Sequence, residues 1–276
     1  MNPGTLFVVA TPIGNLADAS PRALEALRAA DLVACEDTRT TRTLLARHGI
    51  EARTLALHEH NERTAAGRLI EALRQGHNVA LVSDAGTPGL SDPGALLVEQ
   101  AHRAGIRVSP LPGPSAAAAA FSASGFPADR FLFAGFLPAA PAARRKALEE
   151  LDLHFPVILY EAPHRIAEAL QDLLDRFGGA RQIVIARELT KKFEEVVRLP
   201  LAEAPAWLSA QPHRTQGEFV LVLAPGEPRT AAAKDAERTL EVLLEELSPS
   251  DAARLAARIT GAPKRELYRK AMERAK

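Results

Sequence analysis

Residues 78–105 read NVALVSDAGTPGLSDPGALLVEQAHRAG, and they join a short apolar run to a helical pattern. The run at 78–82 predicts a buried strand, and the periodicity of 95–105 predicts a helix. Three glycines, two prolines, two aspartates and two serines lie between them within twelve residues. A turn from strand to helix needs only about two to six residues. The loop at 83–94 therefore holds more turn-forming residues than the connection requires, which raises the question of what else the loop does.

The same order of apolar run and helical pattern repeats on both sides of this stretch. Ser20 and Pro21 are residue types that start a helix. Strands that alternate with helices predict a mostly parallel sheet covered by helices, and such strands read as continuous apolar runs. The further strands are predicted at 6–10, 31–37, 54–60 and 107–113, and the further helices at 21–30, 41–49 and 64–75.

The pattern changes around residues 116–130, where a short helix is expected to end at Gly125. In a later helix, six apolar residues from Ile166 to Phe177 form one buried stripe. Because the strands lie closer together here, we expect a mixed or antiparallel sheet, and we place a domain boundary near residue 120. The predicted strands are 131–136, 156–162, 182–188, 194–201 and 217–224, and the predicted helices are 141–152 and 166–177.

A helical segment is predicted after residue 228. Ser248 is expected to cap its second helix, and Gly261 is expected to separate the second helix from the third, in a layout that resembles a helix-turn-helix. Residues 252–276 hold eight Lys or Arg and only two Glu, so this extension could bind RNA through electrostatic attraction to the phosphates. Alternatively, its helices pack on the body and its arginines are only solvated. The fold class is α/β, with domains at 1–120 and 121–228 and a basic helical extension at 229–276.

Composition excludes several classes of protein. The chain has 276 residues with 34 Lys plus Arg and 34 Asp plus Glu, so any nucleic-acid surface must be local. Cys35 is the single cysteine, which excludes an intramolecular disulfide and a cysteine-rich zinc site. The N-terminus lacks the features of a signal peptide, and no segment reaches the roughly 18 apolar residues of a membrane span. We expect a soluble cytoplasmic protein.

Three loops rich in glycine and proline follow predicted strands, at 11–18, 83–94 and 110–116. In an open α/β sheet, ligands bind outside the carboxyl ends of the strands, so three such loops on one edge predict a pocket for a small molecule. Ordinary turn chemistry is the alternative for any one of them. The chain has neither G-x-G-x-x-G after its first strand nor a P-loop, so these loops do not look built for a pyrophosphate.

Polar clusters lie at further strand ends, in CEDTRTT (35–41), HEHNE (58–62), YEAPHR (160–165) and ARELTKKFEE (186–195). Their side chains could bind a polar substrate or transfer a proton, and the basic ones could hold phosphates. Each residue could equally serve as a helix cap or lie in an ion-paired loop, and for Asp37 capping alone is a sufficient role. HEHNE is not H-E-x-x-H and lies at a strand end, so we expect no metal site.

A set of short motifs occurs along the chain in a fixed order: TPIGNL, EDTR, HEHNE, SDAGTPGLSDPG, PGPSA, SGF, GFLP, YEAPHR and RELTK, followed by GE with alternate valines at 217–222. With these motifs the chain resembles, from residue 6 to about residue 270, the family of bacterial ribosomal RNA small-subunit methyltransferases I. This family belongs to the tetrapyrrole-methylase-like group of S-adenosylmethionine (SAM) enzymes. The chain departs from the family at Cys35, where alanine is usual, and the exchange of one small residue for another in a strand does not weaken the resemblance.

The resemblance implies two α/β domains with SAM in the cleft between them, and a homodimer. It also implies methyl transfer to the ribose 2′-hydroxyl of a cytidine in the decoding region of 16S rRNA, in the small ribosomal subunit. The loop at 83–94 would close over SAM. The residues expected to bind the cofactor are Pro12, Asp84, Gly86, Pro88, Ser91, Ser115, Ala116, Tyr160, Arg187 and Gly217.

Transfer of a methyl group from a sulfonium to an oxygen requires no metal in principle, but a ribose hydroxyl is a poor nucleophile until its proton leaves. We expect Glu36 or Glu59 to act as the base, with His58 and His60 as competitors. The residues expected to bind the substrate are Arg39, Asn61, Arg165 and Lys191.

Two other functions remain open. A methyltransferase that acts on a tetrapyrrole precursor would share the SAM loops but would have little use for a basic extension. A non-catalytic RNA-binding or ribosome-assembly protein would need no general base. Incubation with labelled SAM and either RNA or a porphyrinogen separates these hypotheses.

Overall fold

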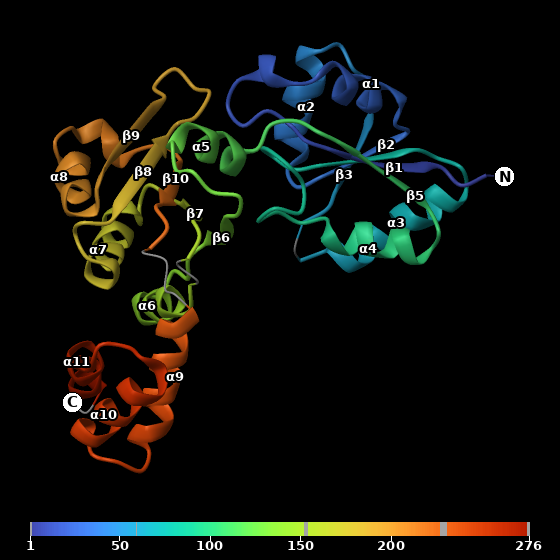
Figure 1. Ribbon diagram of the computed structural model, residues 1–276. Coiled ribbons are helices and arrows are strands. Elements are labelled where there is room, and N and C mark those ends of the chain that lie inside the picture. The colour runs from blue at the N-terminus through green and yellow to red at the C-terminus, as the bar shows by residue number, and fades with distance from the viewer. Residues whose placement is uncertain (1, 59, 152–153, 227–230, 275–276) are drawn as a thin grey trace. The chain divides into compact units, whose positions relative to one another are not determined.

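The computed structural model describes residues 2–58, 60–151, 154–226 and 231–274, and it omits the side chains of 231–234, 273 and 274 (Figure 1). The chain divides into two compact units. The first unit comprises Met1–Asp152 and Pro156–Ala224, and it contains both sheets. The second unit comprises Leu153–Phe155 and Pro225–Lys276.

The first sheet is parallel and has the strand order β3-β2-β4-β1-β5. Two neighbouring strands in its centre, β1 and β4, connect through their helices toward opposite edges, because β1 leads to β2 and β4 leads to β5. The carboxyl ends of such a pair form the crevice where open α/β sheets bind ligands. The strands are β1 (Thr5–Val9), β2 (Leu32–Cys35), β3 (Arg53–Ala56), β4 (Val79–Val82) and β5 (Arg107–Leu111).

Helices cover both faces of this sheet (Figure 1). On one face, α1 (Pro21–Ala29) and α2 (Thr38–Arg47) pack on Val33, Ala80 and Val82. On the other face, α3 (Glu62–Arg74) and α4 (Ala95–Arg103) pack on Ala34, Val79 and Leu81. Alternate residues of β4 thus enter opposite cores, which is why the strand reads as a continuous apolar run.

The second sheet is mixed and has the strand order β6-β7-β10-β8-β9. β6 runs parallel to β7, whereas β10 runs antiparallel to β7 and β8, and β9 runs antiparallel to β8. The helix α5 (Ala116–Ser124) packs on one face of this sheet, against Ile158, Val184 and Val222. The strands are β6 (Leu132–Phe136), β7 (Val157–Glu161), β8 (Gln182–Arg187), β9 (Glu195–Pro200) and β10 (Phe219–Leu223); the other helices are α6 (Pro141–Glu150), α7 (Ile166–Phe177) and α8 (Ala204–Ser209).

The described residues of the second unit form three helices, α9 (Ala231–Leu244), α10 (Pro249–Thr260) and α11 (Lys264–Arg274). Ser248 caps α10 by accepting a hydrogen bond from the amide of Asp251, and Gly261 ends α10 in the left-handed conformation at φ 72°. The small core of this unit contains Leu240, Ala253 and Leu267. The caps predicted from the sequence are therefore confirmed.

The predicted fold class is confirmed: the first sheet is parallel, the second is mixed, and helices form the C-terminal extension. The domain boundary near residue 120 stays a prediction, and α5, which spans that position, packs on the second sheet. None of the helices in the described ranges is long and apolar enough to cross a membrane.

Candidate active site

Hydrogen bonds join the three glycine- and proline-rich loops. Thr11 and Gly86 exchange two backbone hydrogen bonds, with N to O distances of 2.8 and 3.0 Å. The hydroxyl of Thr87 donates to the carbonyl of Pro114 at 3.1 Å. The loops after β1, β4 and β5 therefore form one structure at the carboxyl edge of the first sheet. Gly86 holds φ at 84°, a conformation that glycine adopts without strain.

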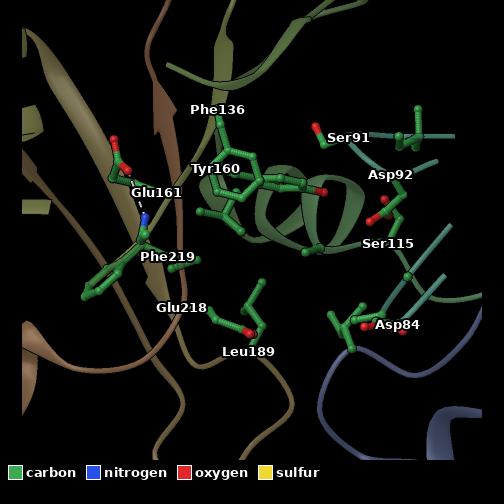
Figure 2. A pocket seen from close by; sticks show the side chains of 18 of the residues that line it. Asp84, Ser91, Asp92, Ser115, Phe136, Tyr160, Glu161, Leu189, Glu218 and Phe219 are labelled. Atoms are coloured by element: carbon green, nitrogen blue, oxygen red, sulfur yellow. Dashed lines mark hydrogen bonds between the residues drawn. The ribbon is translucent and has the colours of Figure 1, made fainter. Parts of the chain in front are cut away.

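A cavity of about 440 Å³ lies beside these loops (Figure 2). Its size falls in the range of about 300–1,000 Å³ that is usual for small-molecule sites. Asp84, Ser91 and Asp92 line it from the loop after β4, while Tyr160, Glu218 and other residues line it from the second sheet. Apolar side chains form much of the remaining wall, and they are Ile13, Leu90, Phe136, Leu189, Phe219 and Val220.

The charge of the cavity wall is one-sided. Four acidic residues line it, Asp84, Asp92, Glu161 and Glu218, and among the described residues no lysine, arginine or histidine does. Glu161 forms an ion pair with Arg165 at 3.1 Å, and Glu218 forms one with Lys191 at 2.9 Å. Such a wall favours a cationic ligand and disfavours a phosphate.

Asp92 is half-buried and lies near two other carboxylates. Burial, together with the negative charges of Glu36 and Asp84, raises the pKa of its carboxyl group from the usual 3.8 to about 6. A carboxylate with a pKa near 6 can accept a proton at neutral pH and is a stronger base than an ordinary one.

Tyr160 brings the second sheet to the cavity. Its hydroxyl oxygen accepts a hydrogen bond from the amide of Ala117 at 3.3 Å, and burial raises the pKa of the phenol. Its ring packs edge-on against Phe133 and Phe136. Ser91 approaches the same sheet closely, because a Cβ on Gly135 would lie 2.8 Å from the Ser91 Oγ atom. The two halves of the first unit therefore meet around the cavity.

The predicted cofactor residues fall into two groups. Six of them line the cavity, namely Asp84, Gly86, Ser91, Ser115, Ala116 and Tyr160. Pro12 lines a smaller cavity of about 250 Å³, which shares Asp84 with the first. Pro88, Arg187 and Gly217 are not among the lining residues. The guanidinium of Arg187 is buried and donates to the carbonyls of Gln216 and Phe193, so it braces two loops. These cofactor contacts stay predictions.

Of the predicted bases, Glu36, His58 and His60 line neither of these two cavities. Burial and Asp84 raise the pKa of Glu36, whereas His58 lowers it. The rings of His58 and His60 have their centroids 6.1 Å apart. Glu59 lies outside the described residues. The role of each as a base stays a prediction.

The predicted substrate residues are engaged within the protein. Arg39 binds the carboxylate of Asp37, which caps α2, at 2.7 Å. Arg165 donates to the carbonyl of Leu137 at 2.5 Å, besides its ion pair with Glu161. The Lys191 ammonium contacts Glu188 and Glu218, both at 2.9 Å. The side chain of Asn61 closes the turn after β3, because it accepts from the amide of His58 and donates to the carbonyl of Ala56. Their contacts with a substrate stay predictions.

Three residues that were not among the predicted site residues also line the cavity, namely Asp92, Phe136 and Glu218. Asp92 lies in the quoted loop, where its SDPG context reads as turn chemistry. Phe136 and Glu218 lie in the GFLP and GE motifs. These motifs contributed to the family resemblance, but neither residue was predicted to line a site.

Two family models match the chain. One, described as Tetrapyrrole (Corrin/Porphyrin) Methylases, matches residues 5–205, and the other, described as RsmI C-terminal HTH domain, matches residues 230–275. Among solved structures, uroporphyrin-III C-methyl transferase from Thermus thermophilus, complexed with S-adenyl homocysteine, has a TM-score of 0.53 and 17% identity over 80% of this chain and 97% of that one. This likeness shows that the fold is shared.

Curated relatives cover nearly the whole chain. A protein of Xylella fastidiosa is 54% identical over 96% of this chain and 98% of its own length. A protein of Pseudomonas aeruginosa is 51% identical over 99% of both chains. Both are named Ribosomal RNA small subunit methyltransferase I. The chain therefore belongs to the tetrapyrrole methylase family and, within it, to the ribosomal RNA small subunit methyltransferase I proteins.

Proposed function

We propose that this protein transfers a methyl group from SAM to the ribose 2′-hydroxyl of a cytidine in the decoding region of 16S rRNA, in the small ribosomal subunit. The names of relatives at 51–54% identity support methylation of this RNA. The observation that supports the cofactor is the negative charge of Asp84 and Asp92 on a cavity wall whose described residues include no lysine, arginine or histidine. A homodimer stays part of the proposal.

The residues of the cavity fit SAM. This cofactor carries a positively charged sulfonium and an ammonium group, and when bound it supplies a methyl group that is already activated for transfer. Asp84 and Asp92 would offer negative charge to those cations, and Phe136 and Leu189 would offer apolar surface to the rest of the molecule. A nucleotide cofactor with phosphates would meet the same carboxylates and be repelled.

The loops around the cavity supply positioning, which accounts for much of the catalysis of such a transfer. The backbone pair between Thr11 and Gly86 holds two of the loops together before any ligand arrives. Ser91 adopts φ 64°, and a non-glycine residue in this region stores strain that the surrounding structure must hold.

Asp92 is the residue best placed to accept the proton of the ribose hydroxyl. As the bond between the ribose oxygen and the methyl carbon forms, the hydroxyl proton must pass to a base. The Asp92 carboxylate lines the cavity, whereas Glu36 and His58 do not. We therefore prefer Asp92 to the candidates in the EDTR and HEHNE motifs.

The direct test is methyl transfer from labelled SAM to small ribosomal subunits from cells that lack this enzyme, with naked 16S rRNA in parallel. We expect label on a ribose 2′-oxygen, and labelling of the subunits alone would identify the assembled particle as the substrate. Label on neither RNA would contradict the proposal. A porphyrinogen assay would then test for a tetrapyrrole substrate.

Replacement of Gly86 with valine should weaken SAM binding by about tenfold, because the new side chain would crowd the cavity wall. A Cβ at this position would lie 3.4 Å from the Ile13 Cγ2 atom and 3.8 Å from the carbonyl oxygen of Pro114. Calorimetric titration with SAM measures the effect. The matched control is Gly89→Val, since Gly89 has nearly the same φ, 80°, but open space around its Cβ position. Equal SAM affinity of the two variants would contradict this placement.

Removal of residues 230–276 should weaken RNA binding and flatten its salt dependence, because the last 25 of these residues hold eight Lys or Arg and two Glu. The family model of an HTH domain over this segment supports a role in binding. RNA affinity measured across a salt series checks the prediction, with SAM affinity as a control for an intact first unit. If the salt dependence of RNA affinity is unchanged, the arginines of this segment do not contact RNA and are only solvated.

A further inference from the structure

A basic groove lies beside the cofactor cavity. It is an open depression of about 900 Å³, formed by residues 14–17 after β1, residues 47–48 at the end of α2, and residues 190–192 between β8 and β9. Arg47, His48, Lys191 and Lys192 line it, and the described walls contain no carboxylate. Its charge is therefore opposite to that of the cofactor cavity.

The groove and the cofactor cavity are linked. The smaller cavity of about 250 Å³ shares Asp84 with the cofactor cavity and Leu16 with the groove. A polymer with one nucleotide at Asp84 could therefore continue past Leu16 toward the cations. A small metabolite would have no need of this path.

Two cations of the groove are available to a ligand. The ammonium of Lys191 is held by Glu188 and Glu218, so its charge is largely balanced. Arg47 and Lys192 are both exposed, and neither has an ion-pair partner among the residues described. Exposed cations without partners, at a wall free of carboxylates, suit the phosphates of a nucleic acid.

An exposed aromatic ring adjoins the groove. The side chain of Phe193 is 64% exposed, and the ammonium of Lys192 lies 5.5 Å from the centre of its ring. Aromatic rings beside cations are the usual platform on which proteins stack single-stranded bases. A bare phosphate ion would gain nothing from this ring, so the pair favours a nucleic-acid strand.

The walls of the groove are fixed to each other. A Cβ on Gly14 would lie 2.5 Å from the Lys191 Cγ atom and 2.9 Å from the Thr190 Oγ1 atom, so the two loops touch closely. Thr190 adopts φ 64°, and its amide donates to the carboxylate of Glu194 at 2.6 Å. Backbone strain of this kind persists only where the surrounding contacts hold it.

We propose that this groove binds the sugar-phosphate backbone of the single-stranded RNA next to the nucleotide to be methylated, with Arg47 and Lys192 on phosphates and Phe193 stacked on a base. This inference rests on the proposed function and gives its substrate a path across the surface. The class of ligand is single-stranded RNA, because the groove combines cations with an exposed ring.

The test uses the full-length double variant Arg47→Ala/Lys192→Ala and a fluorescent single-stranded fragment of 16S rRNA. We expect RNA affinity to fall about tenfold, and the slope of log K against log salt to become shallower by about 1.4, as expected for two lost phosphate contacts. SAM affinity should not change. Phe193→Ala should weaken RNA binding about five- to a hundredfold without changing the salt slope, because no phosphate contact is lost.

The matched control is Arg68→Ala/Arg74→Ala, which removes two exposed arginines on α3 and should leave RNA binding unchanged. If both double variants bind RNA with the affinity and salt slope of the unmodified protein, the inference is overturned. A change of oligomeric state in place of a change in RNA affinity would also overturn it, because the groove would then be an interface between copies of the chain. The methyl-transfer assay of the unmodified protein tests the proposed function independently of the RNA-binding measurements. Failure of the proposed function can therefore be distinguished from failure of this inference.

Discussion

Replacement of Asp92 with asparagine is expected to lower kcat for methyl transfer by about 10²- to 10⁴-fold at saturating SAM, because the variant keeps the shape of the side chain and loses a proton acceptor. Asp92 lies in the loop between β4 and α4 and lines the cavity of about 440 Å³. Single-turnover transfer to small ribosomal subunits measures the effect without a contribution from product release.

The pH dependence identifies the group that is lost. With a pKa raised to about 6, the Asp92 carboxyl group is protonated and inactive as a base at lower pH, so the rate should rise through about pH 6 and level off above it. Asp92→Asn should lose this dependence. Glu36→Gln is the matched control, since Glu36 belongs to the same acidic group but does not line the cavity. If Glu36→Gln loses the dependence and Asp92→Asn keeps it, Glu36 is the base.

A stability measurement gives an independent readout of the same carboxyl group. Because its pKa is higher in the folded protein than in the unfolded chain, the folded state holds the proton more tightly, and stability falls as pH rises from about 4 through about 6. Asp92→Asn removes this penalty, so its Tm should exceed that of the unmodified protein at pH 7. The difference in Tm should vanish near pH 3, where the carboxyl group of Asp92 is protonated in both the folded and the unfolded state.

Replacement of Arg144 with alanine is expected to lower the free energy of unfolding by about 3–5 kcal/mol, because two carboxylates would lose a buried partner. The side chain of Arg144 is 2% exposed, and its guanidinium contacts Asp172 at 2.6 Å and Glu168 at 3.1 Å. These contacts join α6 to α7. Urea unfolding followed by circular dichroism measures the loss.

Arg145 offers a matched control for this prediction. Its guanidinium lies 3.5 Å from the same Asp172, but its side chain is 58% exposed. Arg145→Ala should cost less than about 1 kcal/mol, because solvent screens an exposed pair. If the two alanine variants lose equal stability, burial does not decide the strength of these pairs.

The alternation of strands and helices could be predicted because β4 and its neighbours are buried on both faces. The meeting of the three loops could also be predicted, since parallel strands end at the same edge of a sheet. The start of α1 at Pro21 followed from local capping by Ser20, which requires no knowledge of distant residues.

Charge pairing could not be predicted in the same way. Arg165 and Lys191 were expected to hold phosphates, but each forms an ion pair within the protein. Glu218, one of the two partners of Lys191, lies at the end of another strand. This ion pair therefore exists only after the second sheet has formed. The raised pKa of Asp92 depends in the same way on burial and on the charge of Glu36, both of which arise only when the chain folds.

The backbone pair between Thr11 and Gly86 extends the hydrogen bonding of the first sheet into its loops. Thr11 is 3% exposed and Gly86 is also buried, so both amide hydrogens are shielded from solvent before any ligand binds. Their exchange with deuterated water should therefore be as slow as that of the neighbouring strands. Gly86 thus allows an unstrained bend at φ 84° that the two hydrogen bonds hold in place, so at this position glycine contributes to a rigid loop and not to a mobile one.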